Sequence, residues 1–310
     1  MINSDFSIKN VGIIFFLSFV LFSCEDSKDT SSILKLAGGE LVRIDSFNSE
    51  YVDVKRLDIW LPPSYNSGER LAVVYMHDGQ ALFDGTTTWN GKEWGVDEYF
   101  TTDSVNQKYI VVGIWNAGSN RWTEYFPKKA LDYMDVDSLE ILKNSGIDTI
   151  FNKLNSDKYL KFLVEELKPF IDTSFNVSTE REHTAIMGSS MGGLISWYAA
   201  IEYPEIFGTA LCLSTHWPGI FTNENNPIPG AFKSYIHANV DTAANTRFYF
   251  DTGTAELDSL YLGHQLKVDS IFNSKGFNEK NYFSKVFEGA GHNEDYWRLR
   301  LEYPFSFLLK

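Results

Sequence analysis

Cysteine is almost absent from this chain, which has only two among its 310 residues, Cys24 and Cys212. Cys24 directly follows an apolar run near the N-terminus, so we expect Cys212 to be the only cysteine of the folded domain, without a disulfide partner. Cys212 stands in an apolar stretch, as a small buried hydrophobe would. Two cysteines cannot build a thiolate zinc site, and the sequence has no H-E-x-x-H motif. We therefore expect no metal and no other cofactor.

Basic residues are also few, and they are not clustered. The chain has 27 Lys and Arg against 41 Asp and Glu, which gives a formal net charge of −14. A surface that binds nucleic acid needs clustered Lys and Arg, so we exclude nucleic acid as a partner. The acidic balance favours solubility and a substrate that is uncharged or weakly charged.

The N-terminal region lacks an apolar run of comfortable membrane-spanning length. Residues 11–22 form a short apolar run behind Lys9, which fits the h-region of a signal peptide better than a transmembrane helix. Residues 21–24, Leu-Phe-Ser-Cys, resemble a bacterial lipobox. We therefore expect residues 1–23 to be a lipoprotein signal peptide and Cys24 to carry lipid. Secretion with an unmodified cysteine is the alternative.

A polar segment follows the lipobox. Residues 24–39 are expected to form a tether between the lipid and the folded domain. The lipid would be the chain's only link to a membrane and would place the protein in the bacterial cell envelope. The acidic residues Glu25 and Asp26 resemble signals that export some lipoproteins to the outer-membrane surface.

The remainder of the chain shows neither a long low-complexity linker nor an internal repeat. Residues 40–47 and 54–61 alternate apolar and polar side chains, as an antiparallel pair of strands would. Strands and helices alternate after them. We therefore expect an α/β fold over residues 40–310, with a mostly parallel central sheet and helices on both faces.

The most informative motif is G-x-S-x-G at residues 188–192, followed by a third glycine, Gly193. A short apolar segment, 183–187, precedes it like a buried strand, and residues 194–200 suit a helix. Strand, tight turn and helix are the context in which this motif forms the nucleophile elbow of an α/β-hydrolase. A serine hydroxyl is a weak nucleophile until a base takes its proton. We therefore predict Ser190 to be a catalytic nucleophile.

His292 is the best candidate for that base. It lies between the last predicted strand, 282–287, and the C-terminal helix, on a glycine-flanked loop. In α/β-hydrolases the triad runs Ser, acid, His along the chain, and His292 obeys that order. His216 is a rival, but it follows the strand after the elbow, where loops line the pocket, and we interpret it as a pocket wall.

The acid is expected after the strand at residues 247–250. Three carboxylates follow that point, Asp251, Glu256 and Asp258. Asp251 is expected to belong to the strand, where its direction is fixed. Either Glu256 or Asp258 could hold the tautomer of the imidazole and stabilise the imidazolium, and spacing alone does not choose between them.

An oxyanion hole needs two backbone N–H donors. One is expected from Met191, the residue after the nucleophile, and the other from the loop after the strand at residues 71–76. Gly79 in that loop permits close approach of the backbone, so we place the second donor at Gln80.

Substrate-binding residues are expected on other loops at the same edge of the sheet. Arg121 could clamp a carboxylate or hydrogen-bond sugar hydroxyls, or form a salt bridge with Glu124 that shapes its loop. Trp122 and Trp217 could stack on a sugar or aryl ring. The polar segment 128–156 interrupts the hydrolase pattern, and we interpret it as a lid-like insertion, with a solvated excursion as the alternative.

Four segments together resemble the putative-esterase family of α/β-hydrolases, which includes esterase D, feruloyl and acetylxylan esterases, and siderophore (enterobactin-type) esterases. They are residues 77–84, 93–98, 121–127 and the elbow. The resemblance covers the chain from about residue 42. In similar members a Gly-Thr turn leads to Leu-Asp-x-x-Tyr, here residues 257–261, which favours Asp258 over Glu256. Some siderophore-esterase relatives use a Ser-His dyad.

The resemblance implies a serine ester hydrolase that works through an acyl-enzyme. Its expected substrate is a small-molecule or oligosaccharide ester, in particular an acyl or feruloyl ester of a carbohydrate. A siderophore ester is the alternative substrate. A non-catalytic binding protein on an esterase scaffold remains open, because fold does not fix function, and so does acyl transfer to a sugar or lipid acceptor.

Overall fold

The computed structural model describes residues 36–102, 108–144, 151–220 and 225–309. The predicted signal peptide and the predicted lipid on Cys24 lie outside the described residues, as does most of the tether. Within the described ranges, no helix is long and apolar enough to cross a membrane.

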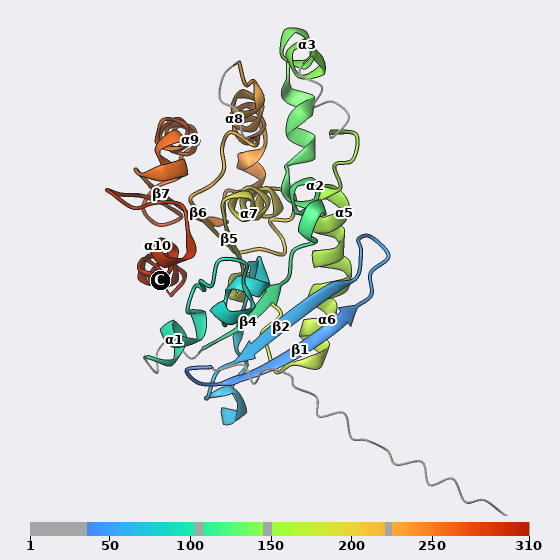
Figure 1. The fold of residues 1–310 in the computed structure, drawn as a ribbon, viewed down its shortest axis with the longest axis vertical. Coiled ribbons are helices and arrows are strands. Elements are labelled where there is room, and N and C mark those ends of the chain that lie inside the picture. Colours follow the sequence, from blue (N-terminus) through green and yellow to red (C-terminus); the bar gives the residue numbers. More distant parts are fainter. Residues whose placement is uncertain (1–35, 103–107, 145–150, 221–224, 310) are drawn as a thin grey trace, which may run out of the picture. The chain divides into compact units, whose positions relative to one another are not determined.

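Eight described strands form one sheet in the order β1-β2-β4-β3-β5-β6-β7-β8. Their bounds are β1 Glu40–Phe47, β2 Lys55–Leu61, β3 Ala72–His77, β4 Tyr109–Ile114, β5 Thr184–Ser189, β6 Thr209–Leu213, β7 Arg247–Gly253 and β8 Tyr282–Phe287. The β1–β2 and β2–β4 pairs are antiparallel, and all the other pairs are parallel. Figure 1 shows β1 and β2 at one edge of the molecule. The predicted mostly parallel sheet, with its antiparallel start, is confirmed.

Helices accompany the sheet along the chain. Those described are α1 Val96–Thr101, α2 Arg121–Tyr125, α3 Val136–Asn144, α5 Ser156–Lys161, α6 Lys168–Ser174, α7 Met191–Glu202, α8 Ile228–Asn239, α9 Leu262–Ser274, α10 Glu294–Arg298 and α11 Glu302–Leu308. A π-helical stretch, Phe162–Leu167, separates α5 from α6. Pro169 follows that stretch. Proline lacks an N–H and crowds the carbonyl four residues earlier, so a regular helix cannot continue through it undisturbed.

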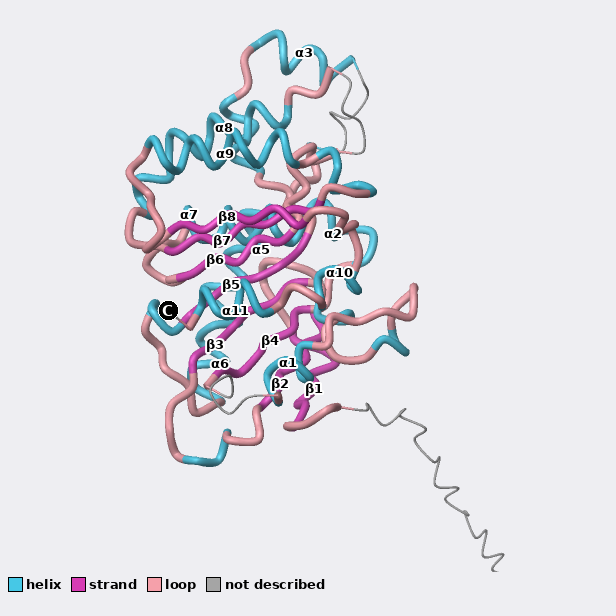
Figure 2. The backbone as a smooth tube through the Cα atoms, turned by 90° about the vertical axis from the view of Figure 1, so that its left-hand side faces the viewer, coloured by secondary structure: helices cyan, strands magenta, loops and turns pink. Residues whose placement is uncertain are grey.

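Strand β7 shows that helices cover both faces of the sheet. Successive side chains of a strand point to opposite faces. Tyr249 faces Phe307 of α11, with ring centroids 6.0 Å apart, whereas Phe250 faces Phe272 of α9 at 5.7 Å. The layers of helix and strand are visible in Figure 2. The predicted α/β fold class is therefore confirmed in full.

The segment 128–156, predicted to be a lid, forms α3 and a 3-10 helix, Lys128–Tyr133, in its described part. Tyr133 packs edge to face on Tyr235 of α8, and α3 lies beyond α8 at the top of Figure 1. The described residues of the segment line neither of the two cavities at Ser190 described below. A lid function stays a prediction.

The parallel strands bring distant parts of the chain to one edge of the sheet. Strands β3 to β8 run in the same direction, so the loops at their carboxyl ends gather there. Such an edge is where open α/β sheets bind ligands.

Candidate active site

Ser190 occupies the turn between β5 and α7. Its φ of 57° and ψ of −121° lie where a non-glycine residue is strained. Neighbouring glycines permit the turn. A Cβ on Gly188 would lie 2.7 Å from the carbonyl carbon of Gly192, and a Cβ on Gly193 would lie 2.8 Å from Thr215 Oγ1. The turn therefore has the strand–turn–helix setting that the sequence predicts.

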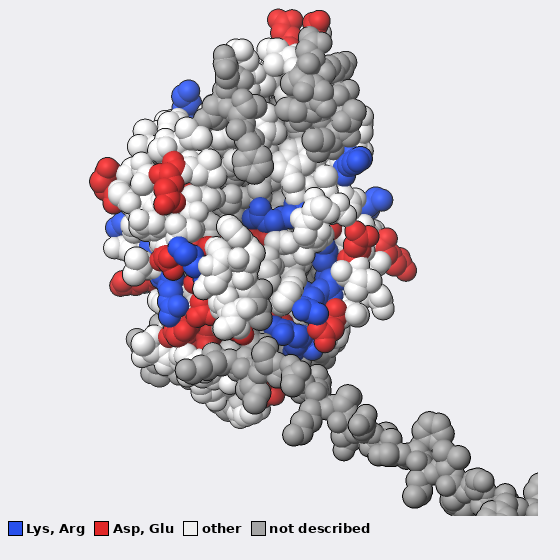
Figure 3. Space-filling view, in the orientation of Figure 1, with Lys and Arg blue, Asp and Glu red and all other residues white. Residues whose placement is uncertain are grey.

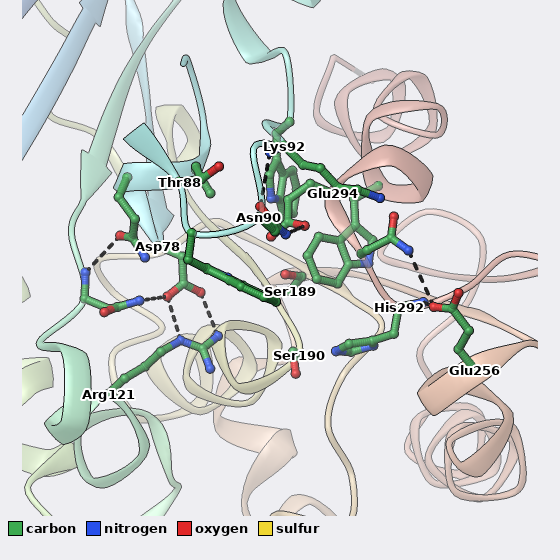
Figure 4. Close-up of a pocket in the computed structure, with 17 residues that line it drawn as sticks. Asp78, Thr88, Asn90, Lys92, Arg121, Ser189, Ser190, Glu256, His292 and Glu294 are labelled. Carbon is green, nitrogen blue, oxygen red and sulfur yellow. Dashed lines mark hydrogen bonds and ion pairs between the residues drawn. The ribbon is translucent and has the colours of Figure 1, made fainter. Parts of the chain in front are cut away.

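Asp258 and His292 meet beside this turn. Asp258 Oδ1 lies 2.5 Å from His292 Nδ1, and the imidazole ring faces Ser190 in Figure 4. The other carboxylate oxygen of Asp258 accepts hydrogen bonds from Ser214 Oγ at 2.5 Å and from the backbone N–H of Gly253 at 2.6 Å. Asp258 is fully buried. These two hydrogen bonds fix the orientation of the carboxylate, so that it can hold one tautomer of the imidazole.

Glu256 supports the histidine loop in another way. Its Oε2 accepts a hydrogen bond from the backbone N–H of His292 at 3.0 Å. A Cβ on Gly291 would lie 2.4 Å from the same oxygen, so the glycine makes room for the carboxylate. Glu256 is exposed and lines the cavity above Ser190. Of the two carboxylates that spacing left open, Asp258 contacts the imidazole and Glu256 contacts the backbone.

A buried charged cluster lies behind Asp258. Arg300 is 2% exposed and pairs with Asp251 at 2.9 Å, and its Nη2 lies 3.9 Å from Asp258 Oδ2. Ser214 links the group, because its Oγ donates to Asp258 and accepts from Arg300. Burial raises the pKa of Asp251 to about 6, although Arg300 opposes this shift. Asp251 belongs to β7, as predicted, and points into this cluster.

Tyr261 joins the site from the start of α9. Its hydroxyl lies 2.6 Å from His216 Nδ1. Its ring meets His292 edge on, with centroids 5.5 Å apart. Burial lowers the pKa of His216 to about 3, so this imidazole is neutral at pH 7. His216 is buried and lines a cavity at Ser190, consistent with a wall and not with a second base.

Gln80 and Met191, which were expected to supply the oxyanion hole, each line a cavity at Ser190. Met191 begins α7, where the first backbone N–H groups have no acceptor within the helix. Gln80 lies in a 3-10 turn that starts after Asp78, whose φ is 59°. A Cβ on Gly79 would lie 2.5 Å from the carbonyl carbon of Gly113 in β4, so glycine lets this turn approach the sheet closely.

Arg121 pairs with Asp78 and not with Glu124. The guanidinium donates to both carboxylate oxygens of Asp78, at 2.6 and 2.8 Å, as Figure 4 shows. Although burial opposes it, Arg121 lowers the pKa of Asp78. Glu124 instead forms a buried ion pair with Lys55. The predicted Arg121–Glu124 salt bridge is therefore wrong, because a buried lysine from β2 competes for that carboxylate.

The two tryptophans predicted to stack on substrate have different positions. Trp122 is half-buried, lines a cavity at Ser190 and donates from Nε1 to the Gly219 carbonyl at 2.7 Å. Trp217 is 1% exposed, stacks on Trp197 and donates to Gln265. The prediction that Trp217 binds substrate is wrong, because the indole belongs to the core.

Two cavities meet at Ser190. The larger, of about 760 Å³, is also lined by Gln80, Glu256 and His292. The smaller, of about 240 Å³, is also lined by Met191 and by other side chains. The larger cavity has further lining residues that were not predicted from the sequence: Asp78, Trp89, Asn90, Lys92, Trp94, Asn116, Asn293, Glu294 and Trp297. Asp78 and Trp94 stand in segments that carry the family resemblance, 77–84 and 93–98, whereas the other residues stand in no motif.

Charges of both signs line the larger cavity. Asp78, Glu256 and Glu294 contribute carboxylates, and Lys92 and Arg121 contribute cations that are themselves paired with carboxylates. Acidic and basic side chains are also interspersed on the molecular face seen in Figure 3. Among the described residues, no group of three or more His, Cys, Asp or Glu side chains could hold a metal ion.

Relatives share much of the chain. The protein YbbA of Bacillus subtilis (strain 168), of uncharacterized function, is 25% identical over 250 residues, which are 78% of this chain and 88% of that protein. The iron(III) enterobactin esterase of Dickeya dadantii (strain 3937) is 24% identical over 152 residues, 47% of this chain. This match spans only 34% of the enterobactin esterase.

Solved structures share the fold. A ferulic acid esterase superimposes with a TM-score of 0.60 at 16% identity, over 88% of this chain and all of that one. The enterobactin esterase Fes from Shigella flexneri, crystallised in the presence of enterobactin, gives a TM-score of 0.61 at 17% identity, over 88% of this chain and 60% of that one.

A protein-family model matches the chain over a long segment. The model described as putative esterase matches residues 148–306, which is just over half of the sequence and includes Ser190, Asp258 and His292. The protein therefore belongs to the putative-esterase family.

Proposed function

We propose that this esterase is a serine hydrolase that works through an acyl-enzyme. Ser190 attacks the ester carbonyl while His292 accepts its proton, and Asp258 holds the imidazole and stabilises the imidazolium. The backbone N–H groups of Met191 and Gln80 stabilise the oxyanion. His292 then protonates the leaving alcohol, and a water molecule activated by His292 releases the acid from Ser190.

One observation carries this proposal: the Asp258–His292 contact beside a strained serine turn. The 2.5 Å contact fixes Nδ1 of the ring, which leaves Nε2 as the nitrogen that can take a proton. Ser190 holds a strained φ of 57° at the edge of a cavity. Strain of this kind persists where the surrounding structure enforces it and is concentrated at functional sites. A scaffold that only binds ligands would not require it.

The proposed substrates are acyl or feruloyl esters of carbohydrates. Amide side chains and indole rings line the larger cavity together, a combination that suits a ring with hydroxyl groups. Its charges are mixed and its cations are paired, so nothing there compensates a strongly anionic substrate. A siderophore ester remains the second candidate, because two of the similar proteins are enterobactin esterases.

The proposed location is the bacterial cell envelope. Cleavage before Cys24 and lipidation of that residue would anchor the catalytic domain, residues 40–310, through the polar tether. The lipobox-like sequence Leu-Phe-Ser-Cys at residues 21–24 supports this part of the proposal.

A substrate screen tests the activity. We would assay p-nitrophenyl acetate, methyl ferulate, acetylated xylan and a catecholate siderophore with the wild type and with Ser190→Ala. We expect hydrolysis of the carbohydrate and feruloyl esters by the wild type alone. Preferential hydrolysis of the siderophore would show that the substrate is a siderophore ester and not a carbohydrate ester. Transfer of the acyl group to an added sugar would show that the enzyme is an acyltransferase and not a hydrolase. A wild type that binds these ligands but hydrolyses none of them would contradict the proposal that the protein is an enzyme.

A further inference from the structure

The two cavities at Ser190 differ in which catalytic groups they contain. Ser190 and Arg121 line both of them. His292 is among the described residues that line the larger cavity, and it is not among those that line the smaller one. Met191 shows the reverse distribution. The two cavities are thus not equivalent for a substrate bound to Ser190.

The chemistry of the tetrahedral intermediate decides how an ester fits between them. Its central carbon carries Ser190 Oγ, the oxyanion, the alcohol oxygen and the acyl carbon. When the intermediate collapses, the bond to the alcohol oxygen breaks, and that oxygen takes the proton held by His292. The alcohol oxygen must therefore lie on the side of His292. The acyl group must then extend to another side of Ser190.

We infer that the alcohol part of the substrate occupies the larger cavity, as a carbohydrate ring against Trp89, and that the acyl group occupies the smaller cavity. This inference rests on the proposed serine mechanism. It makes Trp89 a specificity residue, on a loop between the segments 77–84 and 93–98 that carries no sequence motif.

Trp89 is a conspicuous side chain of the larger cavity. It is 95% exposed, more than any other large hydrophobic residue in the described part of the chain. Leaving an indole in water forgoes the burial of a large apolar surface, and ligand pockets are commonly lined by aromatic side chains, so an indole in the lining of this cavity favours a role in binding. An indole face can pack on the apolar face of a sugar ring.

The loop that carries Trp89 is held in place by two residues that follow the tryptophan. Asn90 donates to Glu294 at 2.8 Å, and Lys92 forms an ion pair with Asp295. Both partners belong to α10, more than 200 residues later in the chain. Because this loop is tied to the helix that follows His292, the backbone segment that carries the indole is held near the histidine loop.

Polar groups of the larger cavity complement a neutral, hydroxylated ring. Asn90, Asn116 and Asn293 line it, and an amide offers both donors and acceptors. Among the described residues that line this cavity, the Lys and Arg side chains are Lys92 and Arg121, and both are already paired with carboxylates. These features favour a sugar over a charged aromatic alcohol.

The smaller cavity suits a compact acyl group. Its volume, about 240 Å³, is roughly a third of that of the larger one. Trp122, His216 and Leu257 form its walls together with Met191. These four walls are apolar or neutral, because burial keeps His216 uncharged. Arg121 also lines this cavity, and its charge is paired with Asp78. Ser119 is an exposed residue in the lining of the smaller cavity, so a larger side chain at this position should narrow the cavity.

The test compares two ratios of kcat/KM in two variants. The alcohol ratio compares an acetylated xylo-oligosaccharide with ethyl acetate, which share the acyl group. The acyl ratio compares p-nitrophenyl butyrate with p-nitrophenyl acetate, which share the alcohol. Trp89→Ala should lower the alcohol ratio about tenfold, equivalent to about 1.4 kcal/mol of stacking, and leave the acyl ratio unchanged. Ser119→Trp should lower the acyl ratio about tenfold and leave the alcohol ratio unchanged.

Controls separate folding from binding. Ser270→Trp adds an indole to the exposed face of α9, outside both cavities, and should leave both ratios unchanged. Melting temperatures check the fold of each variant. If Ser119→Trp does not fold, Leu257→Phe narrows the same cavity.

The possible results are distinct. The inference would be overturned if Trp89→Ala lowered the acyl ratio and Ser119→Trp lowered the alcohol ratio, or if neither variant changed either ratio. Fluorophosphonate labelling of Ser190 would still support the serine mechanism in that case. If Trp89→Ala lowers kcat/KM for phenyl acetate but not for the sugar ester, the assignment of a carbohydrate ring to the cavity at Trp89 is overturned. A wild type that fluorophosphonate does not label would reject the proposed mechanism and the inference with it.

Discussion

Asp258 contacts the side chain of His292, with Oδ1 and Nδ1 2.5 Å apart, from a fully buried position. The neighbouring carboxylate of Glu256 contacts the same histidine only through its backbone N–H. The two acids therefore have separable effects. Asp258 fixes the ring, and Glu256 fixes the loop.

We predict that Asp258→Asn lowers kcat far more than Glu256→Gln. Loss of the acid that holds the imidazole tautomer costs up to about 10⁴-fold in kcat. Glu256→Gln keeps an oxygen that can accept from the His292 N–H and removes only an exposed charge, so we expect a change of a few-fold at most. Steady-state kinetics at pH 7 to 8 decide. A crippled Glu256→Gln with a nearly normal Asp258→Asn would reverse the assignment, and two mild effects would indicate a Ser190–His292 dyad.

We predict that Arg300→Met destabilises the protein by about 3–5 kcal/mol, because it leaves the buried carboxylate of Asp251 unpaired. Asp251→Asn in the same chain should restore part of this loss, since the unpaired charge is then removed. Urea unfolding of the wild type, both single variants and the double variant measures the coupling. Additive losses would show that the two side chains do not stabilise each other.

We predict that buried neutral histidines weaken the fold in acid. Burial lowers the pKa of His77 to about 3, and its Nδ1 lies 2.9 Å from the Tyr159 hydroxyl. An unfolded chain binds this proton near pH 6.5. The unfolded state therefore binds more protons between about pH 6.5 and 3, and stability falls as the pH is lowered through that window, by about 1.4 kcal/mol per unit for each such histidine.

Urea unfolding at several pH values checks this effect. His77→Gln keeps a hydrogen-bonding side chain but cannot titrate, so its stability should depend less steeply on pH than that of the wild type. His183→Gln is the matched surface control, because His183 is exposed. Equal slopes for His77→Gln and the wild type would show that His77 does not take up a proton on unfolding.

We predict that Cys24 carries lipid in the native cell. The short apolar run and the Leu-Phe-Ser-Cys sequence at residues 21–24 motivate this prediction. Mass spectrometry of the mature N-terminus measures it, with Cys24→Ala as the control that should abolish lipidation. Cleavage at another residue, or a free N-terminus at Cys24, would reject the anchor.

Local patterns predicted the parts of the site that depend on neighbouring residues. The glycines around Ser190 and the strand before them identified the turn, and the chain order identified His292. The bounds of β1 and β8 agree with the predicted segments 40–47 and 282–287, because alternation and apolar runs are properties of one segment at a time.

Contacts between distant segments could not be predicted from such patterns. Arg121 forms its ion pair with Asp78, 43 residues away, and not with Glu124, three residues away. Glu124 already pairs with Lys55, which packs against it from β2. Arg300 lies 86 residues from Ser214 and is part of no motif. Trp217 is a core residue for the same reason, since its surroundings come from α7 and α9 and not from its own loop.

The most direct test of the account is the activity and labelling of Ser190→Ala, with Ser189→Ala as the adjacent control. Ser189 ends β5 and lines the same cavity. We expect Ser190→Ala to fold normally, to lose about 10⁴- to 10⁶-fold in kcat on p-nitrophenyl acetate and to escape labelling by a fluorophosphonate. We expect Ser189→Ala to be active and to be labelled at Ser190. A folded Ser190→Ala variant that keeps a tenth of wild-type activity would contradict the serine mechanism.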